Sequence, residues 1–323
     1  MEISEQVAKL YQEATAKQAS DIYFLPFGNY YLIKIRDPHA ITTWQKVPPV
    51  KARRMMNYCK YMADMALSET RRPQTGSMAW QDDSQTYSLR LSTVGDFAGA
   101  ESLVIRIIYD LKTITTSFFN SEAIREINKL ASRRGLVVFS GPTGSGKTTT
   151  IYNLVQQNLS DQFVMTIEDP VEIKESRYLQ LQVNREAGMD YADLIKVGLR
   201  HRPDIFIIGE IRDQVTAEAA IKAALSGHLV YATIHAQDPV GVISRLQQLG
   251  ISDHFIAQAL TAVGYQRLIP TTSGDRRALL KVHEYAGLME MKSYDWRAWQ
   301  DELNDAVTNH QITRTSADQY WFG

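Results

Sequence analysis

The chain has 323 residues, and its 35 Lys and Arg nearly balance 36 Asp and Glu, so its net charge of -1 gives no reason to expect a nucleic-acid or membrane-surface protein. Its single cysteine, Cys59, excludes an internal disulfide and a four-cysteine zinc site. Because the segment MEISEQVAKL lacks the features of a secretory signal and no apolar run approaches the roughly 18 residues that span a bilayer, we expect a cytoplasmic protein that meets the membrane through partners.

Residues 1–110 predict a small α+β domain. Apolar residues recur at helical spacing within residues 4–18, which predicts an amphipathic helix, and DIYFLPFGNYYLIKIRD predicts a hairpin around Phe27-Gly28-Asn29. A second helix has an apolar stripe that we interpret as core packing rather than a cofactor site. The stripe consists of Met55, Cys59, Met62 and Ala66. The segments YSLRLSTV and ESLVIRII predict two further strands.

The pattern changes after Asp110. Residues 111–121 are polar and without period, as in a linker, and strands and helices alternate within residues 122–323. Apolar runs without polar alternation predict strands that are buried on both faces, at Leu136–Ser140, Phe163–Ile167, Ile205–Ile208 and Leu229–Ile234. Helices are predicted at Lys147–Val155, Tyr191–Leu199 and Thr216–Leu225, the last with Thr216 as its N-cap. The predicted fold class is therefore α/β, with a mostly parallel sheet covered by helices, preceded by the smaller α+β domain.

The segment GLVVFSGPTGSGKTTT contains the pattern G-x-x-x-x-G-K-[ST] between a predicted strand and a predicted helix. Its glycines let backbone N–H groups point at phosphate oxygens, and the helix adds its positive N-terminus. Lys147 can reach the β- and γ-phosphates, and the Thr148 hydroxyl can bind magnesium. The predicted nucleotide-binding residues are Gly141, Pro142, Thr143, Gly144, Ser145, Gly146, Lys147, Thr148 and Thr149. The only Asn-Lys pair lacks the aspartate of a guanine-binding motif, so the expected ligands are ATP and Mg²⁺.

Two carboxylates follow predicted parallel strands, Glu168 in VMTIEDPVE and Glu210 in RPDIFIIGEIRD. The carboxyl ends of such strands line the ligand crevice, where the phosphate loop also lies. Gly209 stands where an aspartate that helps to hold magnesium is usual, so we expect Glu210 to serve the attacking water and Glu168 to assist the magnesium shell or the water. His235 follows another strand and is a candidate for sensing the γ-phosphate. No cysteine or third histidine nearby completes a zinc set.

The tail from Met289 is rich in large aromatic residues. It holds Trp296, Trp299, Tyr320, Trp321 and Phe322. We expect a C-terminal helical region in which these aromatics form a packed cap, because large aromatic side chains are usually buried. An exposed contact surface is the alternative.

The segments GPTGSGKTTT, TIEDPVE, RPDIFIIGEIRD and GHLVYATIHAQD, in this order, resemble the Walker A, aspartate, Walker B and histidine boxes of the type II secretion and type IV pilus-assembly ATPases. The segments ASDIYFLP, RRPQTGSM, LRLST and ESLVIRII look like that family's N-terminal domain, so the resemblance extends to about Gly287. It is closest to the competence-pilus branch of Gram-positive bacteria, which also has a short N-terminus and no tetracysteine motif. The resemblance implies a RecA-like ATPase domain.

The resemblance also implies a homohexamer at the inner face of the cell membrane that hydrolyses ATP to assemble a competence pseudopilus for DNA uptake. Its partner would be a polytopic membrane platform protein, with pseudopilins reached indirectly and no direct nucleic-acid binding. Arg90 and Arg106 take the positions of family arginine fingers that reach the ATP of a neighbouring subunit, where a finger can contribute about 10³ to 10⁵ in rate. A pilus-retraction or type IV secretion ATPase is one alternative, and an ATP-binding scaffold without productive turnover is another.

Overall fold

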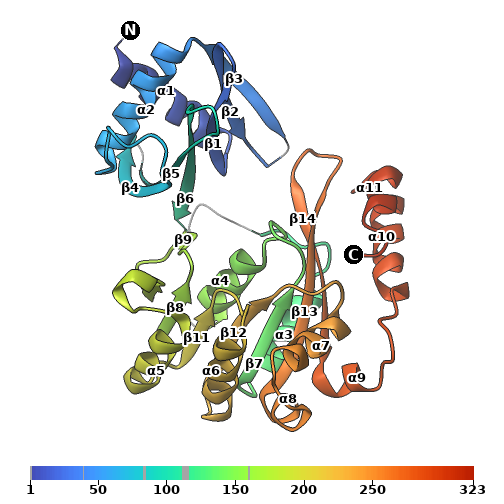
Figure 1. Cartoon of the computed structure of the whole chain (residues 1–323). Helices are drawn as coiled ribbons and strands as arrows, with labels where there is room; N and C mark the ends of the chain where they lie inside the picture. Colours follow the sequence, from blue (N-terminus) through green and yellow to red (C-terminus); the bar gives the residue numbers. More distant parts are fainter. Residues whose placement is uncertain (1, 39, 83–84, 111–115, 159–160) are drawn as a thin grey trace. The chain divides into compact units, whose positions relative to one another are not determined.

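The computed structural model describes every residue except 1, 39, 83–84, 111–115 and 159–160. The chain divides into two compact units, residues 1–110 and 111–323 (Figure 1). Among the described residues, no helix combines the length and the apolar character that a membrane crossing requires. The expected linker, residues 111–121, lies partly outside the described residues. In its described part, Phe118 forms a β-bridge with Ala278, so this part belongs to the second unit.

The first unit is a sheet with two helices. Its neighbouring strands pair antiparallel in the order β3-β2-β1-β6-β5-β4. The elements are α1 (Ile3–Ala16), β1 (Asp21–Phe27), β2 (Tyr30–Arg36), β3 (Ile41–Val47), α2 (Pro49–Met62), β4 (Gln74–Gln81), β5 (Thr86–Gly95) and β6 (Glu101–Asp110). The hairpin turn is tighter than the predicted one and consists of Gly28 and Asn29, since Phe27 pairs with Tyr30 in the sheet. Gly28 permits this turn with φ 57°, in the left-handed region.

The predicted apolar stripe of the second helix is only half correct. Met55 and Cys59 are buried in the core of the first unit. Met62, however, is 43% exposed, and Ala66 is exposed beyond the end of α2. Because the helix ends at Met62, Ala66 does not continue its apolar face. Other side chains complete the core. These are Met56, Ala63 and Met65.

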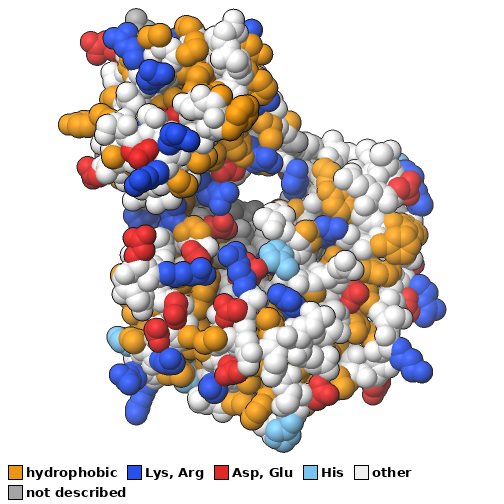
Figure 2. Space-filling model, viewed as in Figure 1, with side chains coloured by type: hydrophobic (Ala, Val, Ile, Leu, Met, Phe, Trp, Pro, Cys, Tyr) orange, Lys and Arg blue, Asp and Glu red, His pale blue; other side chains and the backbone are white. Residues whose placement is uncertain are grey.

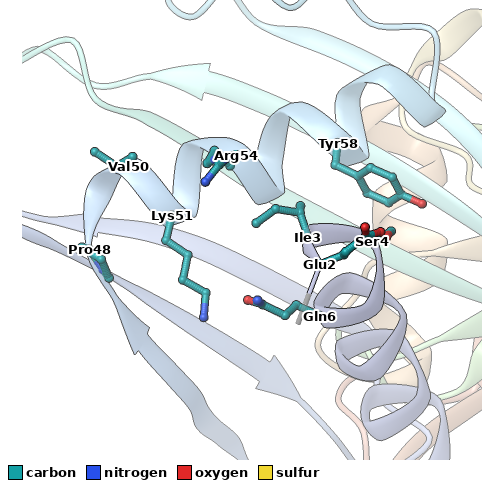
Figure 3. Close-up of a pocket in the computed structure, with 9 residues that line it drawn as sticks. All are labelled: Glu2, Ile3, Ser4, Gln6, Pro48, Val50, Lys51, Arg54 and Tyr58. Atoms are coloured by element: carbon teal, nitrogen blue, oxygen red, sulfur yellow. The ribbon is translucent and has the colours of Figure 1, made fainter.

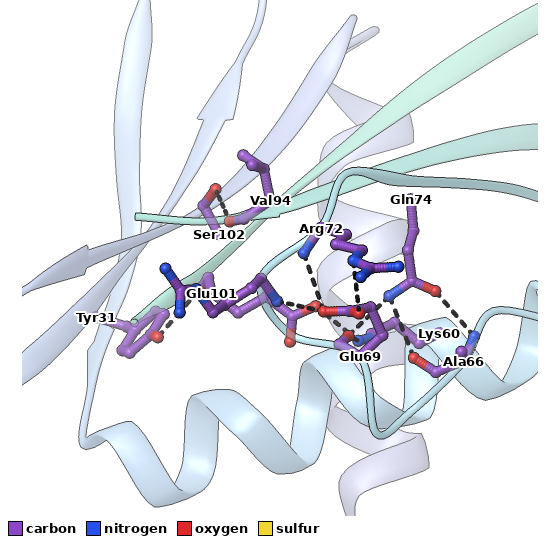
Figure 4. Close-up of polar contacts among 10 residues, drawn as sticks. Tyr31, Lys60, Ala66, Glu69, Arg72, Gln74, Val94, Glu101 and Ser102 are labelled. Carbon is purple, nitrogen blue, oxygen red and sulfur yellow. Dashed lines mark hydrogen bonds and ion pairs between the residues drawn. The ribbon is translucent and has the colours of Figure 1, made fainter. Parts of the chain in front are cut away.

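A buried ion pair ties three segments of the first unit together (Figure 4). The Lys60 side chain is fully buried, and its Nζ donates to Glu101 Oε1 at 2.6 Å and to the Glu69 carbonyl at 2.8 Å. Tyr31 donates its hydroxyl proton to the Glu101 carbonyl at 3.0 Å. Lys60 thus joins α2 to β6 and to the loop before β4, and its charge offsets that of a carboxylate buried beside it.

The second unit has a seven-stranded sheet, in the order β10-β8-β11-β12-β7-β13-β14. Its elements are α3 (Glu122–Ala131), β7 (Gly135–Ser140), α4 (Lys147–Asn158), β8 (Val164–Glu168), β9 (Ile173–Lys174), β10 (Leu179–Gln182), α5 (Tyr191–His201), β11 (Ile205–Ile208), α6 (Gln214–Leu225), β12 (Leu229–Ile234), α7 (Pro239–Gln248), α8 (Asp253–Ala259), β13 (Leu260–Pro270), β14 (Arg276–Glu284), α9 (Tyr285–Met289), α10 (Arg297–Thr308) and α11 (Arg314–Gln319). The pairs from β10 to β13 are parallel, and β14 pairs antiparallel with β13. The prediction of a mostly parallel sheet is therefore confirmed.

Helices cover both faces of this sheet. Side chains from α3 and α4 pack with Val137 and Phe139 on one face. Side chains from α5 to α8 pack with Leu136 and Val138 on the other. This alternation along β7 explains why the predicted strands are continuous apolar runs, since both faces of each central strand are buried.

Two details of the second unit differ from the sequence-based predictions. The N-cap of α6 is Asp213 rather than Thr216, because the Asp213 carboxylate accepts from the Thr216 N–H at 2.8 Å and the helix begins at Gln214. Glu168 is the last residue of β8 and not a residue beyond the strand. Figure 2 shows cationic and anionic side chains interspersed over the viewed face of this unit, in agreement with the balanced composition.

The aromatic tail packs onto the second unit. Trp299 is fully buried against Tyr265 and other side chains of β13 and β14, and its indole N–H donates to the Tyr320 carbonyl at 2.8 Å. The prediction of a packed cap is correct for this part of the tail. Phe322, in contrast, is 67% exposed.

Candidate active site

The phosphate-loop residues connect β7 to α4. Gly141, Gly144 and Gly146 have φ values of 134°, 78° and 81°, a region that side chains disfavour. A Cβ atom on Gly141 would also lie 2.3 Å from the Gln266 carbonyl oxygen. The loop can therefore take this path only with glycine at these positions.

Gln266 of β13 supports the loop from beneath. Its side chain is fully buried, and Nε2 donates to the Ser145 carbonyl at 2.6 Å. Sequence reasoning missed this residue because β13 was not predicted. The available signal was a polar residue inside the apolar run AVGYQRLI, since a buried amide needs a partner.

The Lys147 side chain folds onto the start of the loop. It is 8% exposed, and its Nζ donates to the carbonyls of Gly141 at 2.9 Å and Pro142 at 2.8 Å. Burial lowers the pKa of Lys147 from 10.5 to about 8, while the negative charge of Glu210 opposes this shift. The Lys147 ammonium thus lies at the first residues of the loop, close enough to Glu210 for the two charges to attract each other.

Glu210 lies just beyond β11, in contact with two nitrogen-bearing side chains. Arg212 Nε is 2.6 Å from Oε2, and His235 Nε2 is 3.4 Å from Oε1. The other ring nitrogen of His235, Nδ1, is 3.2 Å from the Gly141 carbonyl oxygen. A neutral imidazole carries a proton on only one nitrogen. When Nδ1 donates its proton to that carbonyl, Nε2 can therefore donate to Glu210 only if the ring is protonated at both nitrogens. The structure therefore brings Glu210, His235 and the start of the loop together, three of the positions selected from sequence.

The structure also gives a reason for Gly209. A Cβ atom at this position would lie 3.2 Å from both Cα and Cγ of Glu168 on the neighbouring strand, and 3.2 Å from the Tyr191 hydroxyl oxygen. The backbone cannot easily shift, because the Gly209 N–H donates to Ile167 O at 2.8 Å and its carbonyl accepts from Thr233 Oγ1 at 2.5 Å. Glu168 thus fills the space that a side chain at residue 209 would need.

Glu168 is buried and engaged in hydrogen bonds within the second unit. Its Oε1 accepts from the Tyr152 hydroxyl at 2.5 Å and from Thr166 Oγ1 at 2.7 Å. The Tyr152 oxygen accepts from Gln180 Nε2 at 2.8 Å. Burial, reinforced by the charge of Glu168, raises the pKa of Tyr152 far above its usual value. Tyr152 was not selected from sequence, and it connects Glu168 to the helix that follows the phosphate loop.

The residues present fit a magnesium ion that arrives with a nucleotide. Thr148, the second residue of α4, is half-buried and offers a hydroxyl oxygen beside the loop. Within the described part of the chain, no group of three or more His, Cys, Asp or Glu side chains could hold a metal by itself. Mg²⁺ prefers oxygen ligands and is usually bound by one or two protein groups together with substrate phosphates, so a single hydroxyl suits it.

Arg90 and Arg106 belong to the first unit, where they face each other across β5 and β6. The Arg106 side chain is 48% exposed, and its Nε is 3.0 Å from Asp21 Oδ1. Like charges directly opposite each other are destabilising, and Asp21 offsets one of them.

Each unit has a cleft. In the first unit, a cleft of about 690 Å³ lies between the starts of α1 and α2, with Lys51 and Arg54 among its lining residues (Figure 3). In the second unit, a cleft of about 500 Å³ is lined by Gly141, Pro142 and His235 together with residues of β13 and the tail. The second cleft includes phosphate-loop residues, and it is the candidate active site.

Comparisons with known proteins identify the family of this chain. The chain matches the family described as "Type II/IV secretion system protein" over residues 1–314. It is 38% identical over 321 residues to the competence protein ComGA of Streptococcus pneumoniae, which covers 98% of this chain and 97% of that protein. It is 34% identical over 264 residues to the type II secretion system protein E of Xanthomonas campestris, which covers 80% of this chain and 46% of that protein.

Two solved structures are similar in fold. The ATPase DotB of Legionella pneumophila superimposes with a TM-score of 0.75 at 18% identity, covering 97% of this chain and 94% of that one. The ADP-bound pilus retraction motor PilT superimposes with a TM-score of 0.68 at 22% identity, covering 96% and 95%. These two likenesses show a shared fold. The family match and the similarity to the competence protein, together with the phosphate loop, show that the chain is an ATPase and belongs to the Type II/IV secretion system protein family.

Proposed function

We propose that this ATPase is a RecA-like, hexameric traffic ATPase that powers the assembly of a competence pseudopilus for DNA uptake. The similarity to the Streptococcus pneumoniae competence protein over nearly the whole of both chains supports the biological role. One structural observation carries the catalytic role: His235 lies between the carboxylate of Glu210 and the first residue of the phosphate loop. In this proposal the ring works at the inner face of the cell membrane, on a polytopic platform protein, and reaches pseudopilins indirectly.

Nucleotide binding depends on the loop and on Lys147. Phosphate oxygens replace the two carbonyls that now accept from the Lys147 ammonium, while loop N–H groups and the start of α4 bind the triphosphate. Magnesium, when bound, neutralises charge on the β- and γ-phosphate oxygens. Thr148 would hold it, with Glu168 at the same edge of the sheet.

Glu210 acts as the base in hydrolysis. One carboxylate oxygen accepts a proton from water as the water oxygen bonds to the γ-phosphorus. The bond from that phosphorus to the bridging oxygen breaks, and ADP leaves with its electron pair. Arg212 orients one oxygen of Glu210, and His235 lies at the other. Because His235 also contacts the Gly141 carbonyl, a movement of the loop can shift His235 and change its contact with Glu210.

Arg90 and Arg106 supply positive charge to the ATP of a neighbouring subunit. This assignment makes hydrolysis depend on assembly of the ring, since the positive charge comes from another chain. A finger of this kind contributes about 10³ to 10⁵ in rate.

The substitution Glu210→Gln tests the base. Gln keeps the size of the side chain and an oxygen that can accept from Arg212, but it cannot take a proton from water. We expect ATP binding to persist while the steady-state rate falls by about 10² to 10⁴. The control Lys147→Ala should lose binding as well as turnover. If the Gln variant hydrolyses ATP at the parent rate, Glu210 is not the base.

Two further measurements separate the proposed role from its alternatives. The ATPase rate per subunit should rise with protein concentration as rings form, and Arg90→Ala or Arg106→Ala should abolish that rise. In cells, both Lys147→Ala and Glu210→Gln should stop transformation. Transformation that survives in the Glu210→Gln strain but not in the Lys147→Ala strain would support an ATP-binding scaffold. Pili that assemble in these strains but fail to retract would support a retraction motor.

A further inference from the structure

Arg267 is a cationic side chain of the active-site cleft to which the proposed mechanism gives no role. It projects from β13, next to Gln266, which supports the phosphate loop. It lines the same cleft as Gly141, Pro142 and His235. All of these residues belong to the second unit, so their arrangement does not depend on the position of the first.

Arg267 lies near enough to Lys147 for the two charges to interact. The positive charge of Arg267 helps to lower the pKa of Lys147, after the larger effect of burial. Two cations close to each other repel, and an anion bound near both relieves the repulsion. The pair therefore favours an anionic ligand at the start of the loop.

The C-terminal segment, Tyr320–Gly323, holds the Arg267 side chain in place. The Arg267 Nη2 group donates to the backbone oxygen of Gly323, and the guanidinium carbon lies 5.8 Å from the centre of the Tyr320 ring. The segment is itself anchored, because the buried Trp299 donates to the Tyr320 carbonyl at 2.8 Å and the Gly323 N–H donates to the same carbonyl at 3.1 Å. Arg267 thus has a defined direction rather than the freedom of a surface arginine.

The Arg267 side chain also forms a hydrogen bond with Tyr265, but one of its nitrogens has no partner within the described residues. Its Nε atom is buried and has no hydrogen-bond partner among them. A buried N–H without a partner is costly, and the planar guanidinium suits bidentate recognition of a phosphate group. A phosphate oxygen would supply the missing acceptor once the guanidinium turns to present Nε to the cleft.

We propose that Arg267 binds the terminal phosphate of the nucleotide, and that the segment Tyr320–Gly323 orients it for this contact. The proposal rests on the proposed function of the cleft as an ATP site. The terminal phosphate is the favoured one because Glu210 acts on the water that attacks it, and His235 connects Glu210 to the part of the loop that Arg267 faces. Arg267 is then a cation supplied by the same subunit, distinct from any arginine of a neighbour.

The experiment compares the affinities of a non-hydrolysable ATP analogue and of ADP, measured by titration calorimetry on the full chain. Arg267→Ala should weaken binding of the analogue by about tenfold to hundredfold, the loss expected for a charge-assisted hydrogen bond. ADP binding should change by less than about threefold, since ADP lacks the contacted phosphate. Arg267→Lys should recover part of the difference. Tyr320→Ala should give a smaller loss that is also selective for the analogue.

Arg314→Ala is the matched control. Arg314 also lies over an aromatic residue of the tail, with its guanidinium carbon 5.3 Å from the Trp321 ring centre, but it does not line the cleft. Its removal should leave both affinities unchanged. The inference is overturned if Arg267→Ala leaves the ratio of the affinities for the analogue and for ADP unchanged, for example by weakening the binding of both equally. If this variant does not fold, the same ratio measured for Arg267→Lys and Tyr320→Ala decides the question. Failure of the parent protein to bind either nucleotide would instead refute the proposed function.

Discussion

Gly209 offers a direct test of how the two strands that carry Glu168 and Glu210 fit together. The substitution Gly209→Ala places a methyl carbon 3.2 Å from the Glu168 Cα and from the Tyr191 hydroxyl oxygen. Carbon atoms are most favourably separated by about 3.5 to 4.0 Å, so the new methyl group is too close. Neither neighbour can withdraw freely, because the Glu168 Cα is part of the β8 backbone and Tyr191 is buried.

The expected cost follows from this geometry. Adding a methylene to a well-packed site costs about 1–3 kcal/mol, and replacing Gly by Ala returns about 0.4–1 kcal/mol through the unfolded chain. We therefore expect Gly209→Ala to lower the free energy of unfolding of the second unit by about 1–2 kcal/mol. The displaced strand end also moves Glu210, and a misplacement of about 1 Å can reduce turnover by about 10².

Urea unfolding followed by circular dichroism, together with the steady-state ATPase rate, measures both effects. Gly287→Ala is the control, because a Cβ atom there would meet nothing within 4 Å. This control should unfold at the parent urea concentration or slightly above it. Gly209→Asp should be more destabilising than Gly209→Ala, since it adds a charge beside Glu168. If Gly209→Ala matches the parent in both unfolding and turnover, the steric explanation for this glycine is wrong.

Two further predictions concern buried lysines. Lys147 has a pKa of about 8, so its side chain is charged below that pH and loses its proton above it. The affinity for the ATP analogue should therefore be constant below about pH 7 and should fall by up to about tenfold per pH unit above pH 8. Binding of the analogue should also be accompanied by proton uptake, which calorimetry measures. Lys147→Arg should remove the pH dependence, and a flat profile for the parent would contradict the assignment. Lys60→Met leaves the Glu101 carboxylate buried without its partner and should cost about 3–5 kcal/mol in urea unfolding. The double variant Lys60→Met/Glu101→Leu should lose less free energy of unfolding than the single variant. Equal losses would show that the unpaired Glu101 carboxylate is not what destabilises Lys60→Met.

Local pattern was sufficient for the central strands and for the phosphate loop. The four predicted strands appear as β7, β8, β11 and β12, with end points shifted by at most one residue. They were predictable because strands buried on both faces are continuous apolar runs. The loop was predictable because its glycines, Lys147 and Thr148 are contiguous, so one segment contains most of the chemistry. The start of α6 was predicted wrongly although its signal is local, since the N-cap is Asp213, three residues before Thr216.

The sequence by itself thus determined the nucleotide-binding class of this protein, through residues that act as neighbours in the chain. Only the tertiary structure decided which distant residues share the site: Glu168 beside Gly209, Gln266 beneath the loop, and Arg267 held by the tail. These contacts join strands and a C-terminal segment that are far apart in sequence. Their partners are set by the order of strands in the sheet and by steric fit, which leave no periodic signature in the chain.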